Sequence, residues 1–312
     1  MTNRRNRALG QVLVTGAAGF LGGELVRRLM EMRAHVIATD CMGAGGGDRS
    51  PRHLDVTDAN QVTETVGAGA IDTIFHCGAV SGPMVMTDRP AEIWRINAGG
   101  TANILEAARL RGVGRVLLCS SVDVYGSRNP AMLDEAMPPA PDTVYGASKV
   151  AAEQALIGYS RQYELDAVAL RFAWIYGPGR RTPSMIPRLL EDGLAGRETV
   201  LDAAPGDFTH YMHVDDAVGA LLAAARTEHL PRLVYNATAG RGLPIQELIG
   251  QISALLPQAR IRLSDGEVPR NPGPLGFDNG NAQRDFGYAP AVSLRDGLRR
   301  YLVALRTSSS GG

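Results

Sequence analysis

Tyr145 and Lys149 are the residues of this sequence whose types and spacing most clearly suggest chemistry. Lys149 is the only lysine among the 32 basic residues of the chain, and all the others are arginine. Arginine is planar, forked and permanently charged, whereas lysine is a compact point charge on a flexible stem. A site that needs a small cation beside a phenol therefore favours lysine. Because residues four apart share one face of a helix, we expect the ammonium group and the phenol to lie together.

Such a pair could transfer protons. The pKa of a free phenol is about 10, so tyrosine is a poor base at neutral pH. An adjacent positive charge lowers that pKa, and Tyr145 could then accept the proton of a substrate hydroxyl. Ser121, at the end of a predicted strand, could hold the same oxygen by a hydrogen bond. Asp123 lies two residues later and could either act near the substrate or brace its loop.

A glycine-rich turn near the N-terminus indicates a bound dinucleotide. Gly16, Gly19 and Gly22 follow an apolar run and precede an amphipathic stretch. In this context the glycines allow a tight turn, let the backbone approach a pyrophosphate and let helix and strand pack closely. Asp40 ends the second predicted strand, where a carboxylate accepts both ribose hydroxyls and repels a 2′-phosphate. The sequence therefore predicts NAD rather than NADP as the cofactor.

Short apolar runs alternate with helical stretches through the first half of the chain. This alternation predicts an α/β fold with a Rossmann-type, doubly wound parallel sheet. The predicted strands are 12–15, 35–39, 53–56, 73–77, 116–120 and 167–172, and the predicted helices are 21–32, 91–110 and 144–163. Asp58 is expected to cap an intervening helix. Ligands bind at the carboxyl ends of the strands in such sheets, which places Ser121 on the same edge as the glycine turn.

The pattern changes after Tyr176, where Gly177-Pro178-Gly179 is followed by shorter elements. We expect an NAD-binding Rossmann domain at 1–176, with a return segment at 212–239. We expect a smaller, discontinuous substrate-binding lid from 177–211 and 240–306, which ends in a helix at 294–305. Residues 307–312 are rich in serine and glycine and are expected to form a flexible tail.

Composition argues against several other functions. The net charge is zero, so nothing favours nucleic acid or an anionic membrane as a partner. Cys41, Cys77 and Cys119 match no disulfide or metal-binding pattern, so we expect free thiols and no bound metal. No apolar run approaches the length of about 18 residues that suggests a membrane span, and no apolar signal core precedes the first strand. The sequence therefore predicts a soluble, cytoplasmic protein.

Taken together, these motifs resemble those of the extended short-chain dehydrogenases/reductases, in the NAD-dependent epimerase/dehydratase family. The matching runs are TGAAGFLG at 15–22, HCGAV at 76–80, NAGGTANILEAA at 97–108, SSVDVYG at 120–126, YGASK at 145–149, RFAWIYGPG at 171–179 and HVDDAVGA at 213–220. The resemblance implies a catalytic triad of Ser121, Tyr145 and Lys149, and a homodimer packed through 91–110 and 144–163. It also implies that NAD is surrounded by Gly16, Ala18, Gly19, Phe20, Leu21, Gly22, Asp40, Asp55, Val56, Ala79, Asn97, Tyr145 and Lys149.

The sequence departs from this family mainly at positions that would contact the substrate. Trp174 stands where sugar-nucleotide enzymes of the family usually carry asparagine, and Thr209 where they usually carry a phosphate-binding arginine. The loss of a bidentate phosphate donor is costly to a site built for a diphosphate. Arg180 and Arg181 could instead hold a carboxylate or form a solvated pair. Arg270 could take the place of a second phosphate-binding arginine.

The most favoured function is NAD-dependent chemistry on a secondary alcohol of a carbohydrate-type substrate. Val122-Asp123 replaces the Asp-Glu pair that sugar-nucleotide dehydratases usually carry, which disfavours 4,6-dehydration. Epimerase-type hydride transfer on a sugar or nucleotide sugar is the leading interpretation. An alternative is a dehydrogenase that releases NADH from a free sugar acid or polyol. A non-catalytic NAD-sensing regulator is a third hypothesis, which the presence of the whole triad argues against.

Overall fold

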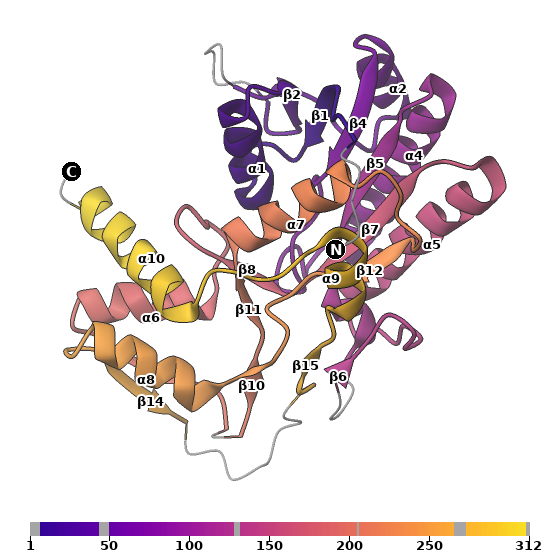
Figure 1. Ribbon diagram of the computed structural model, residues 1–312. Coiled ribbons are helices and arrows are strands. Elements are labelled where there is room, and N and C mark those ends of the chain that lie inside the picture. The colour runs from indigo at the N-terminus through magenta and orange to yellow at the C-terminus, as the bar shows by residue number, and fades with distance from the viewer. Residues whose placement is uncertain (1–6, 44–49, 128–131, 205, 265–272, 310–312) are drawn as a thin grey trace.

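The computed structural model describes residues 7–43, 50–127, 132–204, 206–264 and 273–309 (Figure 1). A large sheet with helices on both faces forms one part of the molecule, at the upper right of Figure 1. A smaller group of helices and short strands forms the other part, at the lower left. Arg270 and residues 310–312 lie outside the described residues.

The large sheet has seven strands within the described residues, and all of its neighbours pair in parallel. Its spatial order is β12-β7-β5-β4-β1-β2-β3. The strands are β1 (Gln11–Thr15), β2 (His35–Asp40), β3 (Arg52–His53), β4 (Ile71–His76), β5 (Arg115–Ser121), β7 (Ala167–Phe172) and β12 (Val234–Asn236). The predicted doubly wound parallel sheet is therefore confirmed, although β3 is shorter than the predicted strand at 53–56. The strand order reverses between β1 and β4, where such sheets bind ligands.

Successive residues of each strand point to opposite faces, and helices cover both faces. Val12, Val14 and Phe75 pack with α1 (Phe20–Glu31) and α7 (Val214–Arg226). Leu13 and Ile74 pack on the other side, with residues of three further helices. These helices are α2 (Ala59–Gly67), α4 (Gly100–Arg111) and α5 (Val144–Tyr163). Because both faces are buried, the strands are apolar on both sides.

The structure contains the predicted cap of α2 but divides the helix predicted at 91–110. Asp58 caps α2, and its side chain accepts hydrogen bonds from the amides of Asn60 and Gln61, as predicted. The predicted helix at 91–110 is instead divided into α3 (Pro90–Trp94), a π-helical turn at Arg95–Gly99 and α4. The turn contains Asn97, whose buried side chain is anchored to other elements, as described below.

The smaller part surrounds a separate apolar cluster. Its helices are α6 (Met185–Leu194), α8 (Ile245–Leu255) and α10 (Leu294–Ser309), and the paired strands β9 (Glu198–Leu201) and β14 (Arg260–Leu263) lie beside them. The described residues also form three further strand pairs: β8 (Trp174–Tyr176) with β11 (Tyr211–His213), β10 (Phe208–Thr209) with β13 (Leu243–Pro244), and β6 (Met132–Leu133) with β15 (Gly276–Phe277). Helix α9 (Gly280–Phe286) follows β15. Helix α10 extends to Ser309, three residues into the segment expected to be a tail.

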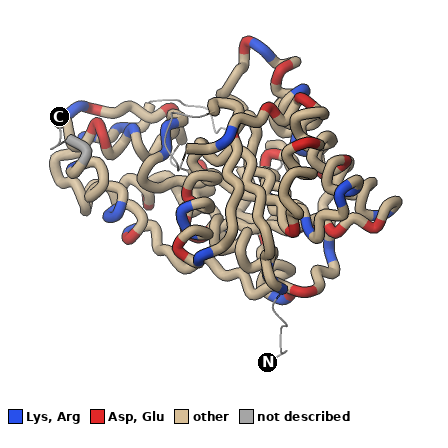
Figure 2. Tube along the Cα trace, turned by 90° about the horizontal axis from the view of Figure 1, so that it is seen from above, with Lys and Arg blue, Asp and Glu red and all other residues tan. Residues whose placement is uncertain are grey.

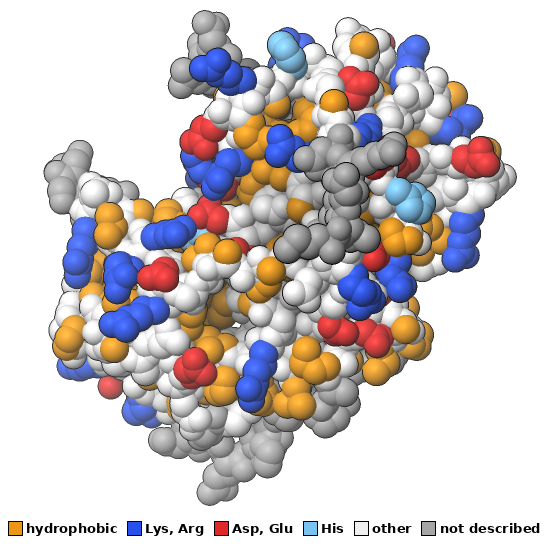
Figure 3. Space-filling view, viewed as in Figure 1, with side chains coloured by type: hydrophobic (Ala, Val, Ile, Leu, Met, Phe, Trp, Pro, Cys, Tyr) orange, Lys and Arg blue, Asp and Glu red, His pale blue; other side chains and the backbone are white. Residues whose placement is uncertain are grey.

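Charged residues of both signs are interspersed along the chain in Figure 2, and their side chains are interspersed over the face shown in Figure 3. The face shown in Figure 3 carries no large patch of a single sign. None of the described helices is long and apolar enough to cross a membrane. Within the described residues, no group of three or more His, Cys, Asp and Glu side chains is arranged to hold a metal ion.

Candidate active site

Helix α5 presents two residues of the predicted triad at the carboxyl edge of the sheet. The helix begins after Thr143, whose Oγ1 accepts a hydrogen bond of 2.9 Å from the Gly146 amide. Tyr145 and Lys149 lie one turn apart and are 8% and 4% exposed. The Lys149 ammonium lies 5.8 Å from the centroid of the Tyr145 ring and donates a hydrogen bond of 2.9 Å to the carbonyl of Cys119 in β5. The structure therefore brings the phenol and the ammonium group together.

Burial dominates the electrostatics of Tyr145. Removal from water raises the pKa of its phenol, and the charge of Asp123 raises it further. The Ser121 hydroxyl and the Arg180 guanidinium act in the opposite direction. Burial also lowers the pKa of Lys149. The groups of the protein itself therefore do not lower the pKa of Tyr145 as expected, because desolvation and the charge of Asp123 outweigh the hydrogen bond to Ser121 and the charge of Arg180.

Asp123 lies beside the triad in a short 3-10 turn, Val122–Tyr125, that continues from β5. Its backbone amide donates a hydrogen bond of 3.1 Å to the Ser121 hydroxyl, which caps the turn. Burial raises the pKa of its carboxyl to about 6. A carboxyl with this pKa changes charge close to neutral pH and can exchange protons with nearby groups. The structure therefore brings Asp123 to the same site as Tyr145.

The glycine loop has the shape that a pyrophosphate requires. Gly16 adopts a φ of +69°, and a Cβ there would lie 2.6 Å from the amide nitrogen of Gly78. A Cβ on Gly22 would lie 2.1 Å from the carbonyl oxygen of Gly16, so the helix can approach the strand closely only without one. No side chain caps the start of α1 at Gly19. The amides of Phe20 and Leu21, in the first turn of this helix, can meet the phosphates of NAD, whereas the Ala18 amide is bonded to Asp40.

The Asp40 carboxylate stands beside this loop. Its Oδ2 accepts a hydrogen bond of 3.0 Å from the Ala18 amide, and its Oδ1 accepts one of 2.9 Å from the Met42 amide. Asp40 is 9% exposed and ends β2. The two amides fix a carboxylate at the place where the ribose of a dinucleotide is expected. This geometry fits NAD and would repel a 2′-phosphate.

Asp55 and Val56 follow β3, but both are used in contacts within the protein. The Asp55 carboxylate accepts hydrogen bonds from the Thr57 amide and hydroxyl, at 2.9 Å and 2.7 Å, and these bonds lower its pKa. The Val56 side chain packs closely against Gly100, and the Val56 carbonyl accepts a hydrogen bond of 3.0 Å from Asn103. The Asp55 carboxylate therefore caps its own loop.

The Asn97 side chain holds the loop that follows β4 by hydrogen bonds to its backbone. Its Oδ1 accepts a hydrogen bond of 2.8 Å from the Val80 amide. Its Nδ2 donates to the Val80 carbonyl, at 3.3 Å, and to the Ser148 hydroxyl of α5, at 2.9 Å. Ala79 lies in the loop that these bonds hold and is partly exposed. The buried amide thus positions the backbone at Ala79 relative to the catalytic helix.

The two candidate substrate arginines within the described residues occupy different surroundings. Arg180 is partly buried, and it donates hydrogen bonds to the carbonyls of Ile175, at 2.6 Å, and Thr182, at 3.2 Å. Its guanidinium lies 5.9 Å from the Trp174 ring centroid, and its charge affects Tyr145. Arg181 is exposed instead. The structure therefore brings Arg180 to the catalytic group and leaves Arg181 at the surface.

Comparison with known proteins establishes the family. The sequence model of the NAD dependent epimerase/dehydratase family matches residues 12–237, which is most of the chain. The chain belongs to this family. A UDP-glucose 4-epimerase of Mycolicibacterium smegmatis is 30% identical to it over 320 residues, which cover 96% of this chain and 99% of that protein. A dTDP-glucose 4,6-dehydratase of Streptomyces griseus is 31% identical, with 92% of this chain and 91% of that protein covered.

A solved structure agrees with this assignment. The structure of MoeE5 in complex with UDP-glucuronic acid and NAD has a TM-score of 0.84 to this chain at 30% identity, and the match covers 96% of this chain and 100% of that one. The extended short-chain dehydrogenase/reductase fold inferred from the motifs is confirmed. The protein is therefore an enzyme of the epimerase/dehydratase family, and its cofactor is NAD.

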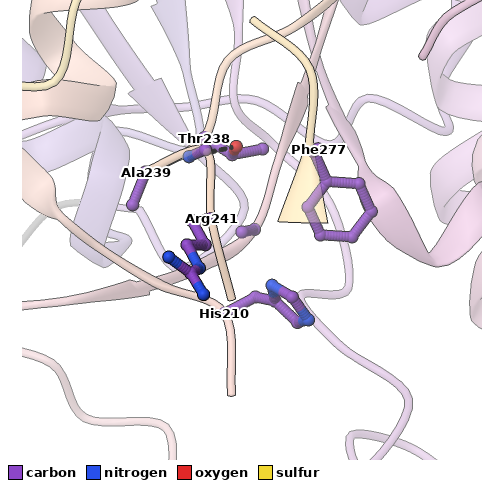
Figure 4. Close-up of a pocket in the computed structure, with 7 residues that line it drawn as sticks. His210, Thr238, Ala239, Arg241 and Phe277 are labelled. Atoms are coloured by element: carbon purple, nitrogen blue, oxygen red, sulfur yellow. Dashed lines mark hydrogen bonds between the residues drawn. The ribbon is translucent and has the colours of Figure 1, made fainter. Parts of the chain in front are cut away.

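A small hollow that the sequence did not predict lies beside β10 and β15 of this epimerase/dehydratase-family enzyme (Figure 4). The surrounding side chains fill it so closely that it has no room for a water molecule in this structure. Its lining residues are Ala173, His210, Thr238, Ala239, Gly240, Arg241 and Phe277. The His210 ring and the Arg241 side chain approach the same space. Burial lowers the pKa of His210, and its Nε2 has no hydrogen-bond partner among the described residues.

A buried ion pair behind the triad was also missed. Glu153 lies four residues after Lys149, on the same face of α5. Its carboxylate accepts hydrogen bonds from the Arg171 guanidinium of β7. It also accepts one of 2.5 Å from the Ser120 hydroxyl. The Arg171 guanidinium also lies 4.8 Å from the centroid of the Tyr125 ring. These contacts join α5, β5 and β7 directly beneath the catalytic residues. The spacing of Glu153 from Lys149 was the available signal in the sequence.

Proposed function

We propose that this protein is an NAD-dependent enzyme of epimerase type, which oxidises a secondary hydroxyl of a sugar and reduces the ketone from its other face. The observation that carries the proposal is the convergence of Ser121, Tyr145 and Lys149 beside the glycine loop. The relatives of the chain include a UDP-glucose 4-epimerase, which supports chemistry at a sugar hydroxyl. Residues 177–211 and 240–306 would form the lid that holds the sugar.

Each residue of the site has a distinct role in this proposal. NAD⁺, when bound, supplies a hydride acceptor with a positively charged ring. Tyr145 takes the hydroxyl proton and later returns it, and Ser121 holds the same oxygen. Lys149, fixed by the Cys119 carbonyl, keeps a positive charge next to the phenol. Because burial raises the pKa of Tyr145, this charge and that of Arg180 are needed for it to act as a base.

We propose Arg180 as the residue that binds a negatively charged group of the sugar, such as a carboxylate. Support comes from its position, because it is partly buried and close enough to Tyr145 for its charge to affect the phenol. MoeE5 was solved with UDP-glucuronic acid, a sugar nucleotide that carries a carboxylate. His210 and Arg241, in the pocket of Figure 4, are proposed to contact a more distant polar group of the same substrate.

A second candidate is an NAD-dependent dehydrogenase of a free sugar acid or polyol. Thr209 and Trp174 favour it, because the side chains with which many sugar-nucleotide enzymes bind a diphosphate are missing there. The Thr209 hydroxyl donates a hydrogen bond of 3.2 Å to the Leu243 carbonyl, which ties it into the β10–β13 pair. The substrate would then lack a nucleotide, and NADH would be released after each oxidation.

One experiment separates the two candidates. The protein is incubated with NAD⁺ and either UDP- or GDP-sugars, including a UDP-uronic acid, or free sugar acids, aldoses and polyols. NADH absorbance and the stereochemistry of the recovered sugar are followed together. A new epimer without net NADH supports the epimerase. Stoichiometric NADH with free sugar acids, and no reaction with nucleotide sugars, would reject the epimerase and support the dehydrogenase.

We also propose a homodimer that packs through α3, α4 and α5. Trp94, Leu110 and Tyr163 are large apolar or aromatic residues of these helices, and 43%, 54% and 49% of their surfaces are exposed. The Arg109 guanidinium lies 5.0 Å from the Tyr163 ring centroid on this surface. Sedimentation of the purified chain should give twice the mass of one chain. Tyr163→Arg should shift the equilibrium to monomer, and a monomeric unsubstituted protein would reject this proposal.

A further inference from the structure

The structure places two cysteines next to each other beneath the cofactor loop. Cys77 directly follows β4, and Cys119 lies in the adjacent strand β5. His76 pairs with Leu118, so Cys77 and Cys119 are the next residues in register on these parallel strands. Both contribute to the apolar cluster on the α1 and α7 face of the sheet. Their sulfur atoms are 3.5 Å apart.

We propose that Cys77 and Cys119 form a modification site in which a hydroperoxide oxidises the two thiols to a reversible disulfide. The Cys77 sulfur attacks a peroxide oxygen, the O–O bond breaks, and a sulfenic acid and one water form from hydrogen peroxide. The Cys119 sulfur then displaces the sulfenic oxygen as a second water, and the S–S bond forms. Two thiol hydrogens and two electrons pass to the peroxide. A small thiol such as glutathione or dithiothreitol reverses the reaction by exchange.

The backbone geometry permits this bond. A disulfide requires Cα atoms about 4.4–6.8 Å apart, and adjacent strands lie about 4.8 Å apart. The sulfur atoms must approach from 3.5 Å to the bonded distance of about 2.05 Å, which requires rotation of the side chains and a small shift of the strands. Oxidant would reach the pair on the Cys77 side, because Cys77 as a residue is less buried than Cys119, although burial also raises the pKa of its thiol and slows this step.

The site should respond to sustained rather than brief oxidation. The hydrogen bond from Cys119 and burial both raise the pKa of the Cys77 thiol. The thiolate is the reactive form, so a neutral thiol reacts slowly with peroxide. The neighbouring thiol compensates in the second step, because it is held in contact with the sulfur it must attack. Because peroxide would oxidise Cys77 slowly and Cys119 would then attack quickly, the disulfide would form with little accumulated sulfenic acid.

Both cysteines contact groups that serve the cofactor site. The Cys77 amide donates a hydrogen bond of 3.2 Å to the Thr15 carbonyl, and a Cβ on Gly16 would lie 2.7 Å from the Cys77 carbonyl carbon. The Cys119 carbonyl accepts the hydrogen bond of Lys149. A shift of either backbone would therefore move the glycine loop or the lysine. Oxidation should weaken NAD binding as a result.

The test uses the full chain with Cys41→Ser, which removes the exposed third thiol and leaves only the pair. The reduced protein is treated with hydrogen peroxide, quenched, unfolded and alkylated. We expect an intact mass lower by two hydrogens, no alkylated cysteine, and a peptide that joins 77 to 119 until dithiothreitol is added. NAD binding is measured by calorimetry before and after oxidation. We expect about tenfold weaker binding after oxidation, because the disulfide would hold the backbone next to the glycine loop out of position.

Two matched variants make the result decisive. Cys77→Ala and Cys119→Ala, each in the Cys41→Ser background, should no longer lose two hydrogens or form a joined peptide, and peroxide should weaken their NAD binding far less than that of the protein with both cysteines, each compared with its own untreated sample. This comparison remains valid even if either substitution lowers stability. Two alkylated cysteines after prolonged peroxide treatment would overturn the proposed disulfide. A disulfide that leaves NAD affinity unchanged would overturn the proposed link to the cofactor site.

Discussion

The Glu153 carboxylate binds the Arg171 guanidinium through two hydrogen bonds, of 2.9 Å and 2.7 Å, and their side chains are 1% and 4% exposed. The same carboxylate accepts a hydrogen bond from Ser120, the neighbour of Ser121. This pair fixes the catalytic helix α5 against two strands of the sheet. Removal of one member would leave a charge without a partner in a buried environment.

We expect Glu153→Gln to lower the free energy of unfolding by about 3–5 kcal/mol, because Arg171 would remain charged and buried without its partner. Urea denaturation measures this change. Arg299→Gln, which removes an exposed ion pair with Asp296, is the control and should have far less effect. The double variant Glu153→Leu/Arg171→Met should regain part of the loss. A single variant as stable as the unsubstituted protein would show that the pair does not support α5.

Tyr145→Phe should abolish turnover while the protein still binds NAD. The substitution removes only the hydroxyl that is proposed to exchange the proton, and phenylalanine fills the same buried space. Calorimetry with NAD⁺ and a product assay on the sugar that the unsubstituted enzyme converts measure the two effects separately. An active Tyr145→Phe enzyme would refute the assigned base.

Lys149→Arg keeps the positive charge but should lose most activity. The ammonium group is buried, and it fits between the Cys119 carbonyl and the Tyr145 ring. The guanidinium is larger and planar, and its donors are fixed in a fork that cannot meet both partners. The measurement is kcat compared with the unsubstituted enzyme, with the circular dichroism spectrum as a check on folding. Retention of full kcat would show that any cation suffices at this position.

Asp123 should make stability depend on pH. Its folded-state pKa, about 6, lies above the unfolded value of about 3.9, so the carboxyl favours folding at low pH and this contribution is lost as the pH rises through about 6. Asp123→Asn keeps the site neutral. At pH 8 the variant should be more stable than the unsubstituted protein by about 1–3 kcal/mol, and at pH 4 the two should be equal. Denaturant titrations at both pH values measure this, and an equal difference at each would contradict the assignment.

Gly22→Ala should disrupt the cofactor loop. The added Cβ would meet the Gly16 carbonyl oxygen at 2.1 Å, so the start of α1 must move away from β1. We expect a loss of NAD binding by calorimetry together with a lower melting temperature. Gly219→Ala in α7 is the matched control, because a Cβ added there would have no neighbouring atom within 4 Å among the described residues, and it should retain NAD binding. Normal NAD affinity in Gly22→Ala would argue against this account of the loop.

Local spacing explains which features could be predicted from the sequence. Tyr145 and Lys149 share a helix face because a helix has a fixed period. The Asp58 cap of α2 was predictable because its contacts are to residues only two and three positions later in the chain. The π-helical turn around Asn97 depends instead on Val80 and Ser148, which are distant in sequence. No local pattern could therefore reveal that the predicted helix at 91–110 is divided.

Contacts between residues of different helices and strands could not be predicted from the sequence either. Arg171 meets Glu153 because β7 lies beside β5 under α5, and Cys77 meets Cys119 because of the register between β4 and β5. Sheet order and register are set by the whole chain, not by a motif. The rise in the Tyr145 pKa was missed for the same reason, since burial depends on every element that covers the phenol.

The position of β12 also affects the order in which the molecule can be completed during synthesis. This strand pairs with β7, yet Val234 follows Phe172 only after the segment that contains α6, β9 and α7. Until residue 236 has left the ribosome, the outer edge of β7 has no neighbouring strand. An open edge can pair with another chain. Truncated chains that end before β12 should therefore aggregate, which gives the return of the chain to the sheet a protective role.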